Sequence, residues 1–422
     1  MITKSIQITD KVNLSYIKTD KFKTNYISFE FISPLDRQRV HYNSMLPLIL
    51  MRGTNKYPTL ASINKRLQYL YSSDIIASNT SFGQYQCFGM KMNMLNNRFT
   101  ADTDVTLETV DLLCEILFNP LLKDGAFDKT YTEDKKANLI DTIESLKNNK
   151  GGYAINRLKE EMCKNEVFSI SKYGEIEDVK KITPESLYAA YNEALSVYPI
   201  EIYAVGDMDI DSVAAKFKEC FSKIHRKSIE IGEIQLINEA KEIKKVVDIE
   251  KVKQARLVLG FRTGYDYREN KYHIVQLFNE ILGGSPTSKL FLNVREKMSL
   301  CYSCRSIVNQ KNGLLIISAG IDQKNKEIAE NAILKQLEAI KNGDITEEEF
   351  SSAKKSIRNG YLSITDSAES MHSWTFFRAL CGISTMPQEE SEKIANTTIE
   401  QIKEFANRIT LDTVYFLRGE EE

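Results

Sequence analysis

Apolar and polar residues alternate along the chain with the periods of strands and helices, and the same order of elements occurs twice. Tyr26 to Ile32 alternates as a half-buried strand, and Tyr42 to Met51 has the spacing of a helix that stops at Gly53. The rest of the first half is predicted to contain a helix at 61–71, two strands within 80–94, helices at 107–117 and 132–146, a helix opened by Thr183 and Pro184, and a strand at 199–206. This mixture predicts an α+β fold.

The second half repeats this plan. The landmarks are Phe31, Tyr42 and Gly53, which recur 230 positions later as Phe261, Tyr272 and Gly283. The helix start at Thr183 recurs as Thr398, 215 positions later, so the spacing shrinks as loop deletions would make it. The common order predicts two homologous domains, each an antiparallel-rich sheet with helices packed on it. We expect them at 1–224 and 246–422, joined by a charged, weakly periodic linker at 225–245.

Composition narrows the classes of partner. The 422 residues include 56 basic and 58 acidic ones, and this near balance gives no electrostatic case for nucleic acid or an anionic membrane surface. The first residues lack a cationic segment followed by an apolar one, and the longest apolar run, Met45 to Met51, is too short to span a membrane. We therefore expect a cytoplasmic protein with no nucleic-acid or membrane partner.

The seven cysteines are scattered, and their odd number fits reduced, buried thiols better than a disulfide framework. Only Cys301 and Cys304 are close in sequence, inside a predicted strand. No second pair completes a zinc site with them, so a metal or redox role for these two thiols is the minor alternative.

The most informative stretch is 281–302. Gly283 and Gly284 end one helix, Ser285 and Pro286 are typical of the start of the next, and apolar positions at helical spacing continue this second helix to about Lys297. A strand is then predicted from Cys301 to Ile307. Arg295 and Tyr302 therefore lie on either side of a helix-to-strand turn, from which both side chains can project towards one point. The alternative is an amphipathic helix with a solvated arginine and a core tyrosine.

This stretch resembles the signature of the second domain of insulinase/pitrilysin-type (inverzincin) metallopeptidases, namely a glycine pair, a helix that ends in Arg-Glu-Lys and a following Leu-x-Tyr. Met51 to Asn55 resembles the turn after the metal-binding helix of the first domain, and the likeness covers nearly the whole chain. The resemblance implies that the two domains form one half of a clamshell that encloses an extended peptide. It also implies that Arg295 and Tyr302 bind that peptide.

The same resemblance places the metal site on residues of the wrong type. Active members carry His-x-x-Glu-His, in which two histidines hold zinc and the glutamate takes a proton from the zinc-bound water. The corresponding histidine positions here are Ser44 and Leu48, the base position is Pro47, and the third ligand position is Lys135. We therefore expect no catalytic residue, no metal and no cofactor in this chain. His41, the histidine nearest to this motif, is expected to be a solvated helix-start residue.

The resemblance implies a catalytically incomplete subunit. It would pair with a related zinc-bearing subunit, or with itself, and supply Arg295 and Tyr302 to a composite peptide-processing site. The chain is similar to the non-catalytic-looking member of a bacterial pair associated with 5-aminopentanol modification of elongation factor P. That association with a pathway does not follow from any residue of this sequence. One alternative is a structural scaffold with the peptidase fold, like the core subunits of the respiratory bc1 complex. Another is a stand-alone zinc peptidase with unusual ligands.

Overall fold

The computed structural model describes residues 1–101, 103–233 and 236–420. The chain forms two compact units, and each unit combines three separate stretches. Unit 1 contains residues 1–144, 170–233 and 366–377, and unit 2 contains residues 145–169, 234–365 and 378–422. Within the described residues, no helix has both the length and the apolar character that crossing a membrane requires.

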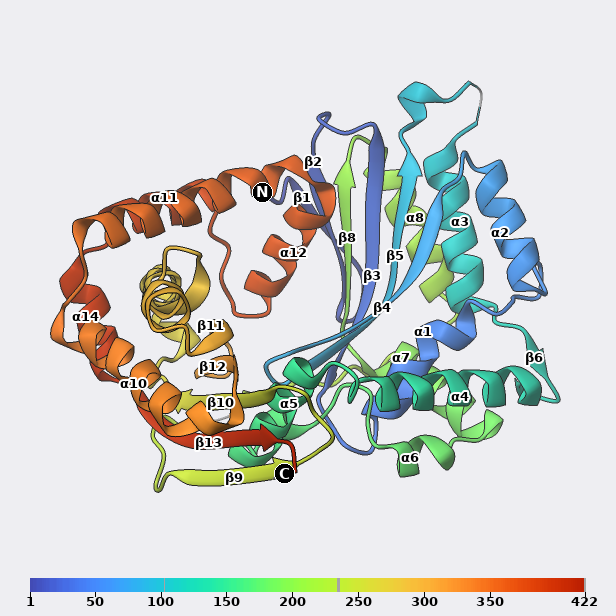
Figure 1. Ribbon diagram of the computed structural model, residues 1–422. Coiled ribbons are helices and arrows are strands. Elements are labelled where there is room, and N and C mark those ends of the chain that lie inside the picture. The colour runs from blue at the N-terminus through green and yellow to red at the C-terminus, as the bar shows by residue number, and fades with distance from the viewer. Residues whose placement is uncertain (102, 234–235, 421–422) are drawn as a thin grey trace. The chain divides into compact units, whose positions relative to one another are not determined.

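Unit 1 is built on a six-stranded sheet (Figure 1). Its strands lie in the order β1 (Lys4–Thr9), β2 (Val12–Lys18), β8 (Ile200–Gly206), β3 (Thr24–Pro34), β5 (Tyr85–Leu95) and β4 (Asp74–Phe82). Strands β2 and β8 are parallel, whereas the other neighbours are antiparallel. The longer helices of this unit are α1 (Val40–Leu50), α2 (Leu60–Tyr69), α3 (Val105–Phe118), α4 (Lys129–Ser145), α7 (Pro184–Val197) and α8 (Ile210–Phe221).

Unit 2 is built on a five-stranded sheet. Its strands lie in the order β11 (Cys301–Asn309), β12 (Leu314–Ile321), β10 (Ala255–Arg262), β13 (Thr410–Arg418) and β9 (Lys244–Ile249). Its regular helices are α5 (Lys150–Met162), α9 (Tyr272–Asn279), α10 (Lys326–Asn342), α11 (Glu347–Ser363), α13 (Pro387–Asn396) and α14 (Ile399–Asn407). Two π-helical segments, Glu280–Gly284 and Leu290–Lys297, follow α9.

The two sheets have the same topology once β1 is set aside. Read from one edge, β2, β8, β3, β5 and β4 correspond to β9, β13, β10, β12 and β11, and the parallel pair is in the same place in both. The helix starts at Thr183 and Thr398 also correspond, because each threonine forms a capping box with the residue three positions later. The prediction of two homologous α+β units with antiparallel-rich sheets is confirmed.

One pair of equivalent helices is exchanged between the two halves of the sequence. Helix α5 comes from the first half but packs on β10 and β13 of unit 2, where Ala154 and Leu158 join the buried cluster of Val258 and Tyr415. Its counterpart α12 (Ala368–Ala379) comes from the second half, and its residues up to Phe377 belong to unit 1. Residues 225–243 contain no helix or strand in their described part. Whether 1–224 and 246–422 fold as separate domains stays a prediction.

The two faces of the unit 1 sheet differ in chemistry because side chains alternate along each strand. On β3, Ile27, Phe29 and Phe31 join the large apolar core beneath the helices. Ser28 and Glu30 point to the opposite face, where Ser28 Oγ lies 2.9 Å from a ring nitrogen of His372 on α12. All five side chains are buried, so this second face is a buried polar layer.

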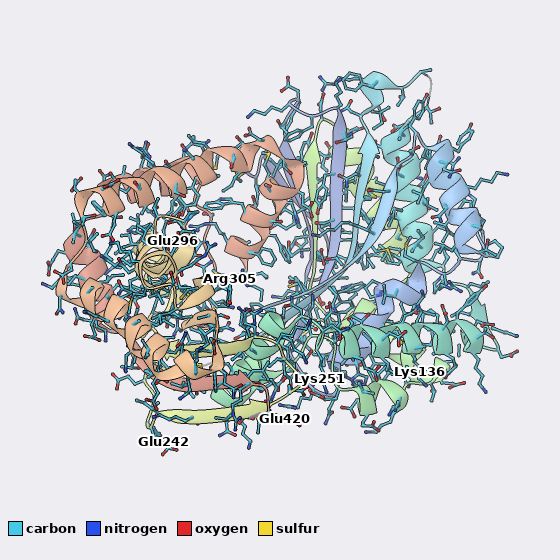
Figure 2. All side chains as sticks on the ribbon, in the orientation of Figure 1. Lys136, Glu242, Lys251, Glu296, Arg305 and Glu420 are labelled. Atoms are coloured by element: carbon cyan, nitrogen blue, oxygen red, sulfur yellow. The ribbon has the colours of Figure 1, made fainter. Side chains whose placement is uncertain are left out.

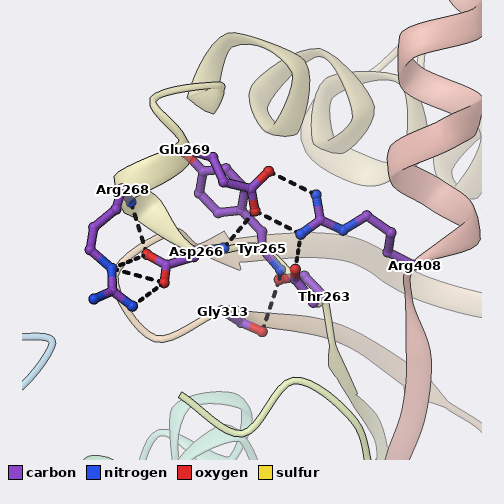
Figure 3. A network of polar contacts seen from close by, with 8 residues as sticks. Thr263, Tyr265, Asp266, Arg268, Glu269, Gly313 and Arg408 are labelled. Carbon is purple, nitrogen blue, oxygen red and sulfur yellow. Dashed lines mark hydrogen bonds and ion pairs between the residues drawn. The ribbon is translucent and has the colours of Figure 1, made fainter. Parts of the chain in front are cut away.

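In unit 2, a polar network fixes the loop between β10 and α9, the counterpart of α1 (Figure 3). The Arg408 guanidinium pairs with Glu269 at 2.7 Å and also donates to the Gly264 carbonyl. This ion pair holds the pKa of the Glu269 carboxyl below its usual range. Thr263 Oγ1 donates to the Gly313 carbonyl at 3.0 Å. The network therefore ties the entry of α9 to the sheet that carries the following segment, 281–309.

Candidate functional site

The residue at the first expected metal-ligand position, Ser44 on α1, is already fully engaged in hydrogen bonds. Its hydroxyl is buried, donates to the Lys172 carbonyl, and accepts from the side-chain amides of Asn79 at 2.8 Å and Gln86 at 3.3 Å. A neutral hydroxyl with three partners is a poor zinc ligand, because structural and catalytic zinc sites use thiolate, imidazole and carboxylate.

Neighbouring amides complete this network. The Gln86 amide nitrogen donates to the Lys172 carbonyl at 2.9 Å, and its oxygen accepts from Asn43 at 3.0 Å. The Lys172 ammonium donates in turn to the Asn79 carbonyl at 2.6 Å. Neutral groups and one lysine therefore occupy the neighbourhood in which an active member would hold a cation.

The other three positions of the expected site fit zinc no better. Pro47 is buried inside α1 and has no group that accepts a proton, and Leu48 has only a hydrocarbon side chain. Lys135 lies on α4, next to Lys136, which is labelled in Figure 2. The Lys135 ammonium is 3.7 Å from the Asp134 carboxylate. An ammonium repels a divalent cation. The donor set of this chain therefore does not fit the metal that the resemblance implies.

The histidines do not rebuild the site. Among the residues that the structure describes, no three His, Cys, Asp or Glu side chains group as a metal ion would require. The expectation of a solvated His41 is wrong: its side chain is buried against Tyr42, with ring centroids 4.4 Å apart, and burial lowers its pKa. Gly174 packs closely against His41, since a Cβ at Gly174 would lie 2.9 Å from the His41 Cβ.

The glycine pair of segment 281–309 serves close packing. A Cβ at Gly283 would lie 2.7 Å from the backbone nitrogen of Ser306 on β11, so only glycine lets this segment approach the strand. The second helix begins later than the sequence suggests. Ser285 and Pro286 form a turn, closed by a 3.2 Å bond from the Ser288 N–H to the Ser285 carbonyl, and π-helical hydrogen bonding starts only at Leu290.

Arg295 lies in the last turn of that helix and keeps its charge near the surface. Its guanidinium is stacked over the Phe291 ring at 4.4 Å from the centroid, and its Nε is 3.6 Å from the Glu296 carboxylate. Figure 2 labels Glu296 on this helix. The Arg295 side chain remains 39% exposed, so solvent screens its pairing with Glu296. The stacked guanidinium is held in place and still has donors for a ligand.

Tyr302 is pushed outward by a β-bulge, which the sequence alone did not reveal. In the pairing of β11 with β12, Cys301 faces Ile321 and Ser303 faces Gly320, so Tyr302 is the extra residue without a partner. Its side chain is 76% exposed. It lines a cavity of about 330 Å³ together with Gln254, Ala255, Ile321, Asp322 and Gln323. Tyr302 is therefore not the core tyrosine of the alternative interpretation.

The structure places Arg295 and Tyr302 in the same unit, on adjoining elements, and both are accessible. The bulge also turns Cys301 and Cys304 to the same buried side of β11, where their thiols share a hydrogen bond. That hydrogen bond and the nearby Arg295 charge lower the pKa of Cys301. Convergence of Arg295 and Tyr302 on one peptide, and the substrate-binding role of both, stay predictions.

The polar face of the unit 1 sheet carries a second group that sequence reasoning did not single out. Glu30 is 2% exposed, and burial raises its pKa to about 7. On the neighbouring strand β8, burial likewise raises the pKa of its cross-strand partner Glu201 to about 7. Alternation along β3 was visible in the sequence, but it did not reveal that both faces of this strand are covered.

Glu30 should make the free energy of unfolding depend on pH. Because its pKa is higher in the folded than in the unfolded chain, the folded state loses stability as pH rises from about 4.5 to about 7. The loss above pH 7 is at most about 3 kcal/mol. Urea unfolding of the wild type and of Glu30→Gln at pH 5, 6, 7 and 8 measures this. As pH rises, the unfolding free energy of the wild type should fall steadily relative to that of the variant. Parallel curves would contradict the assignment. Lys91, Glu201 and His372 also face Glu30, and Lys91 is paired with Glu369; all four are common to both proteins.

Comparison with known proteins agrees with this picture of a peptidase fold without its metal site. Residues 181–357 match the family model described as "Peptidase M16 inactive domain". The chain is 35% identical to "Probable inactive metalloprotease YmfF" of Bacillus subtilis over 96% of this chain and 95% of that protein. It is 26% identical to "Uncharacterized zinc protease YmxG" of the same organism over 44% and 47% of the two chains.

Among solved structures, a conserved protein from Enterococcus faecalis V583 superimposes with a TM-score of 0.93 at 29% identity, covering 99% of both chains. The replaced ligands, the duplicated fold and these full-length likenesses lead to one assignment. The chain belongs to the M16, or insulinase/pitrilysin-type, metallopeptidase family, and it is an inactive homologue within that family.

Proposed function

We propose that this chain is the non-catalytic subunit of a two-subunit zinc peptidase. It pairs with a zinc-bearing relative and supplies Arg295 and Tyr302 to a composite site that cleaves an extended peptide. One contrast carries the proposal. The metal positions are filled by a closed network around Ser44, whereas a bulge keeps Tyr302 76% exposed.

The two side chains suit the opposite wall of such a site. The Tyr302 hydroxyl can donate a hydrogen bond to the carbonyl oxygen that gains negative charge when water attacks the peptide bond. Arg295, stacked on Phe291, can donate to a peptide carbonyl or carboxylate. Neither group activates water, so the partner must supply the metal and the base.

An extended peptide has open strand edges to bind. The edge strands of the unit 1 sheet are β1 and β4, and those of the unit 2 sheet are β9 and β11, the strand that carries Tyr302. The outward N–H and C=O groups of an edge strand pair readily with an added strand. A peptide on β11 would run directly past the exposed tyrosine. The link to elongation factor P modification stays a prediction.

Co-expression with zinc-bearing relatives from the same genome tests the proposal. We expect co-purification in equal amounts, cleavage of a quenched fluorescent peptide library by the mixture alone, and zinc in proportion to the partner only. Cleavage or stoichiometric zinc in this chain alone would overturn the proposal. Full activity of the partner alone, unchanged when this chain is added, would favour a structural scaffold.

A further inference from the structure

A cavity of about 380 Å³ lies within unit 1, on the polar face of the sheet beside the edge strand β4. We call it the Glu30 cavity. It is lined by Glu30, Ser78 and Thr80 from the strands, by Lys91 of β5, and by Phe376 and Phe377 of α12. Asn79, which donates to Ser44 in the replaced metal site, also lines the cavity, whereas the other residues named here belong neither to that site nor to segment 281–309.

The cavity forms because a glycine stands in the row of side chains that crosses the strands. Glu30 of β3 faces Gly89 of β5, and Gly89 faces Ser78 of β4. A Cβ at Gly89 would lie 1.9 Å from the carbonyl oxygen of Phe29, so this position excludes a side chain. The missing side chain lets Ser78 reach Glu30 with its hydroxyl across the gap.

Glu30 has unused hydrogen-bonding capacity. Ser78 bonds to its carboxyl group, but Oε2 is buried and has no hydrogen-bond partner among the described residues. His372 does not fill this role, since its two ring nitrogens lie 3.2 Å from Tyr26 Oη and 2.9 Å from Ser28 Oγ. A buried carboxylate oxygen without a partner costs stability unless a ligand pairs with it.

The charges around the cavity favour a cation. Lys91 is the one lysine among the described lining residues, and its ammonium is paired with Glu369 of α12 at 3.2 Å. His372 is uncharged at neutral pH, because burial lowers its pKa to about 3. Glu369 therefore already neutralises Lys91, which leaves the Glu30 carboxyl group without a cation of its own. The rings of Phe376 and Phe377 offer an apolar wall against which the hydrocarbon stem of a long basic side chain can pack.

We propose that the Glu30 cavity binds the ammonium or guanidinium group of a lysine or arginine side chain in the extended peptide. The inference rests on the proposed function, and it names the substrate class that this subunit would select. A strand added to the free edge of β4 sends every second side chain to the face that carries Ser78 and Thr80. One of those side chains enters the cavity beside Glu30.

The test uses small probes on the purified chain, so that it does not depend on the partner. Acetyl-lysine methylamide and acetyl-norleucine methylamide, which differ by the ammonium group, are titrated by NMR against the wild type, Glu30→Gln and Glu201→Gln. We expect the lysine probe to bind about tenfold more tightly than the norleucine probe. Glu30→Gln should abolish this preference. Glu201→Gln is the matched control and should keep it, because Glu201 lies on the same face, is bound by Asn13 and does not line the cavity.

Three outcomes would each overturn the inference. They are equal binding of the two probes, no binding of the lysine probe at millimolar concentration, and a preference for the lysine probe that survives in Glu30→Gln. Thermal melts of the variants show whether the fold is retained. The mixed complex is assayed separately on peptides with lysine or norleucine at one position. Cleavage of both peptides at equal rates would contradict the cavity proposal and leave the proposed two-subunit peptidase unaffected. Absence of any cleavage would contradict the proposed peptidase function, whatever the probes show.

Discussion

Replacing Tyr302 by phenylalanine is expected to lower the turnover of the two-subunit peptidase by about 100-fold while the complex still assembles. The change removes one hydroxyl from a side chain that is already 76% exposed, so it should not disturb packing. A single donor aimed at the developing oxyanion accounts for a loss of about 100- to 1000-fold when it is removed. The measurement is kcat and KM of the mixed complex on a fluorogenic peptide, with size-exclusion chromatography to confirm assembly.

Matched controls separate a role in the site from surface chemistry. Tyr69→Phe alters another exposed tyrosine, on α2, and should leave kcat unchanged. Arg295→Ala should weaken peptide binding, whereas Arg305→Ala, an exposed arginine on the same strand as Tyr302 and labelled in Figure 2, should not. Wild-type turnover in both Tyr302→Phe and Arg295→Ala would leave the scaffold interpretation as the better one.

Replacing Arg262 by alanine should cost unit 2 about 3 to 5 kcal/mol of unfolding free energy. Arg262 is 1% exposed and bonds to both carboxylate oxygens of Glu166, at 2.7 and 3.0 Å, and to Asp412 at 2.9 Å. It also donates to the Met162 carbonyl at the end of the exchanged helix α5. Its removal leaves two buried carboxylates without their cation. Urea denaturation, with the midpoint and slope fitted together, measures the loss.

Arg256→Ala provides the comparison for Arg262. Both arginines lie on β10, but the Arg256 Nε has no hydrogen-bond partner in the part of the chain that the structure describes. We expect Arg256→Ala to cost no more than about 1 kcal/mol. Equal effects of the two substitutions would show that the ion pairs of Arg262 with Glu166 and Asp412 contribute little to stability. Those ion pairs would then not be what holds α5 on the unit 2 sheet.

The strongest sequence predictions were those that depend on short-range patterns. The strand at 26–32 and the helix at 42–51 became β3 (Thr24–Pro34) and α1 (Val40–Leu50), with boundaries shifted by one or two residues. Helix starts marked by Thr183-Pro184 and Thr398 were also right, because a cap satisfies its own backbone N–H groups within one turn. The predicted start of the helix after Gly284 was wrong, since Ser285 and Pro286 form a turn there and do not cap the helix.

Tertiary packing decided the features that no local pattern encodes. His41 was predicted to be solvated, yet it is buried, and Gly174, more than one hundred positions away, packs against it. The exchange of α5 and α12 depends on which sheet each apolar face finds, and the hydrophobic period of a helix is the same in either place. The bulge that exposes Tyr302 depends on its register with β12, which sequence spacing does not reveal.

The sequence by itself determined the duplicated α+β plan and the side-chain types at the expected zinc positions, because periodicity and side-chain type are properties of the residues themselves. Serine, proline, leucine and lysine at 44, 47, 48 and 135 lack the imidazole, thiolate and carboxylate groups that bind zinc in proteins. Only the tertiary structure decided which charged groups are buried and which are offered to a ligand. Burial of Glu30 and exposure of Tyr302 arise from what packs against them, and those neighbours come from distant parts of the chain.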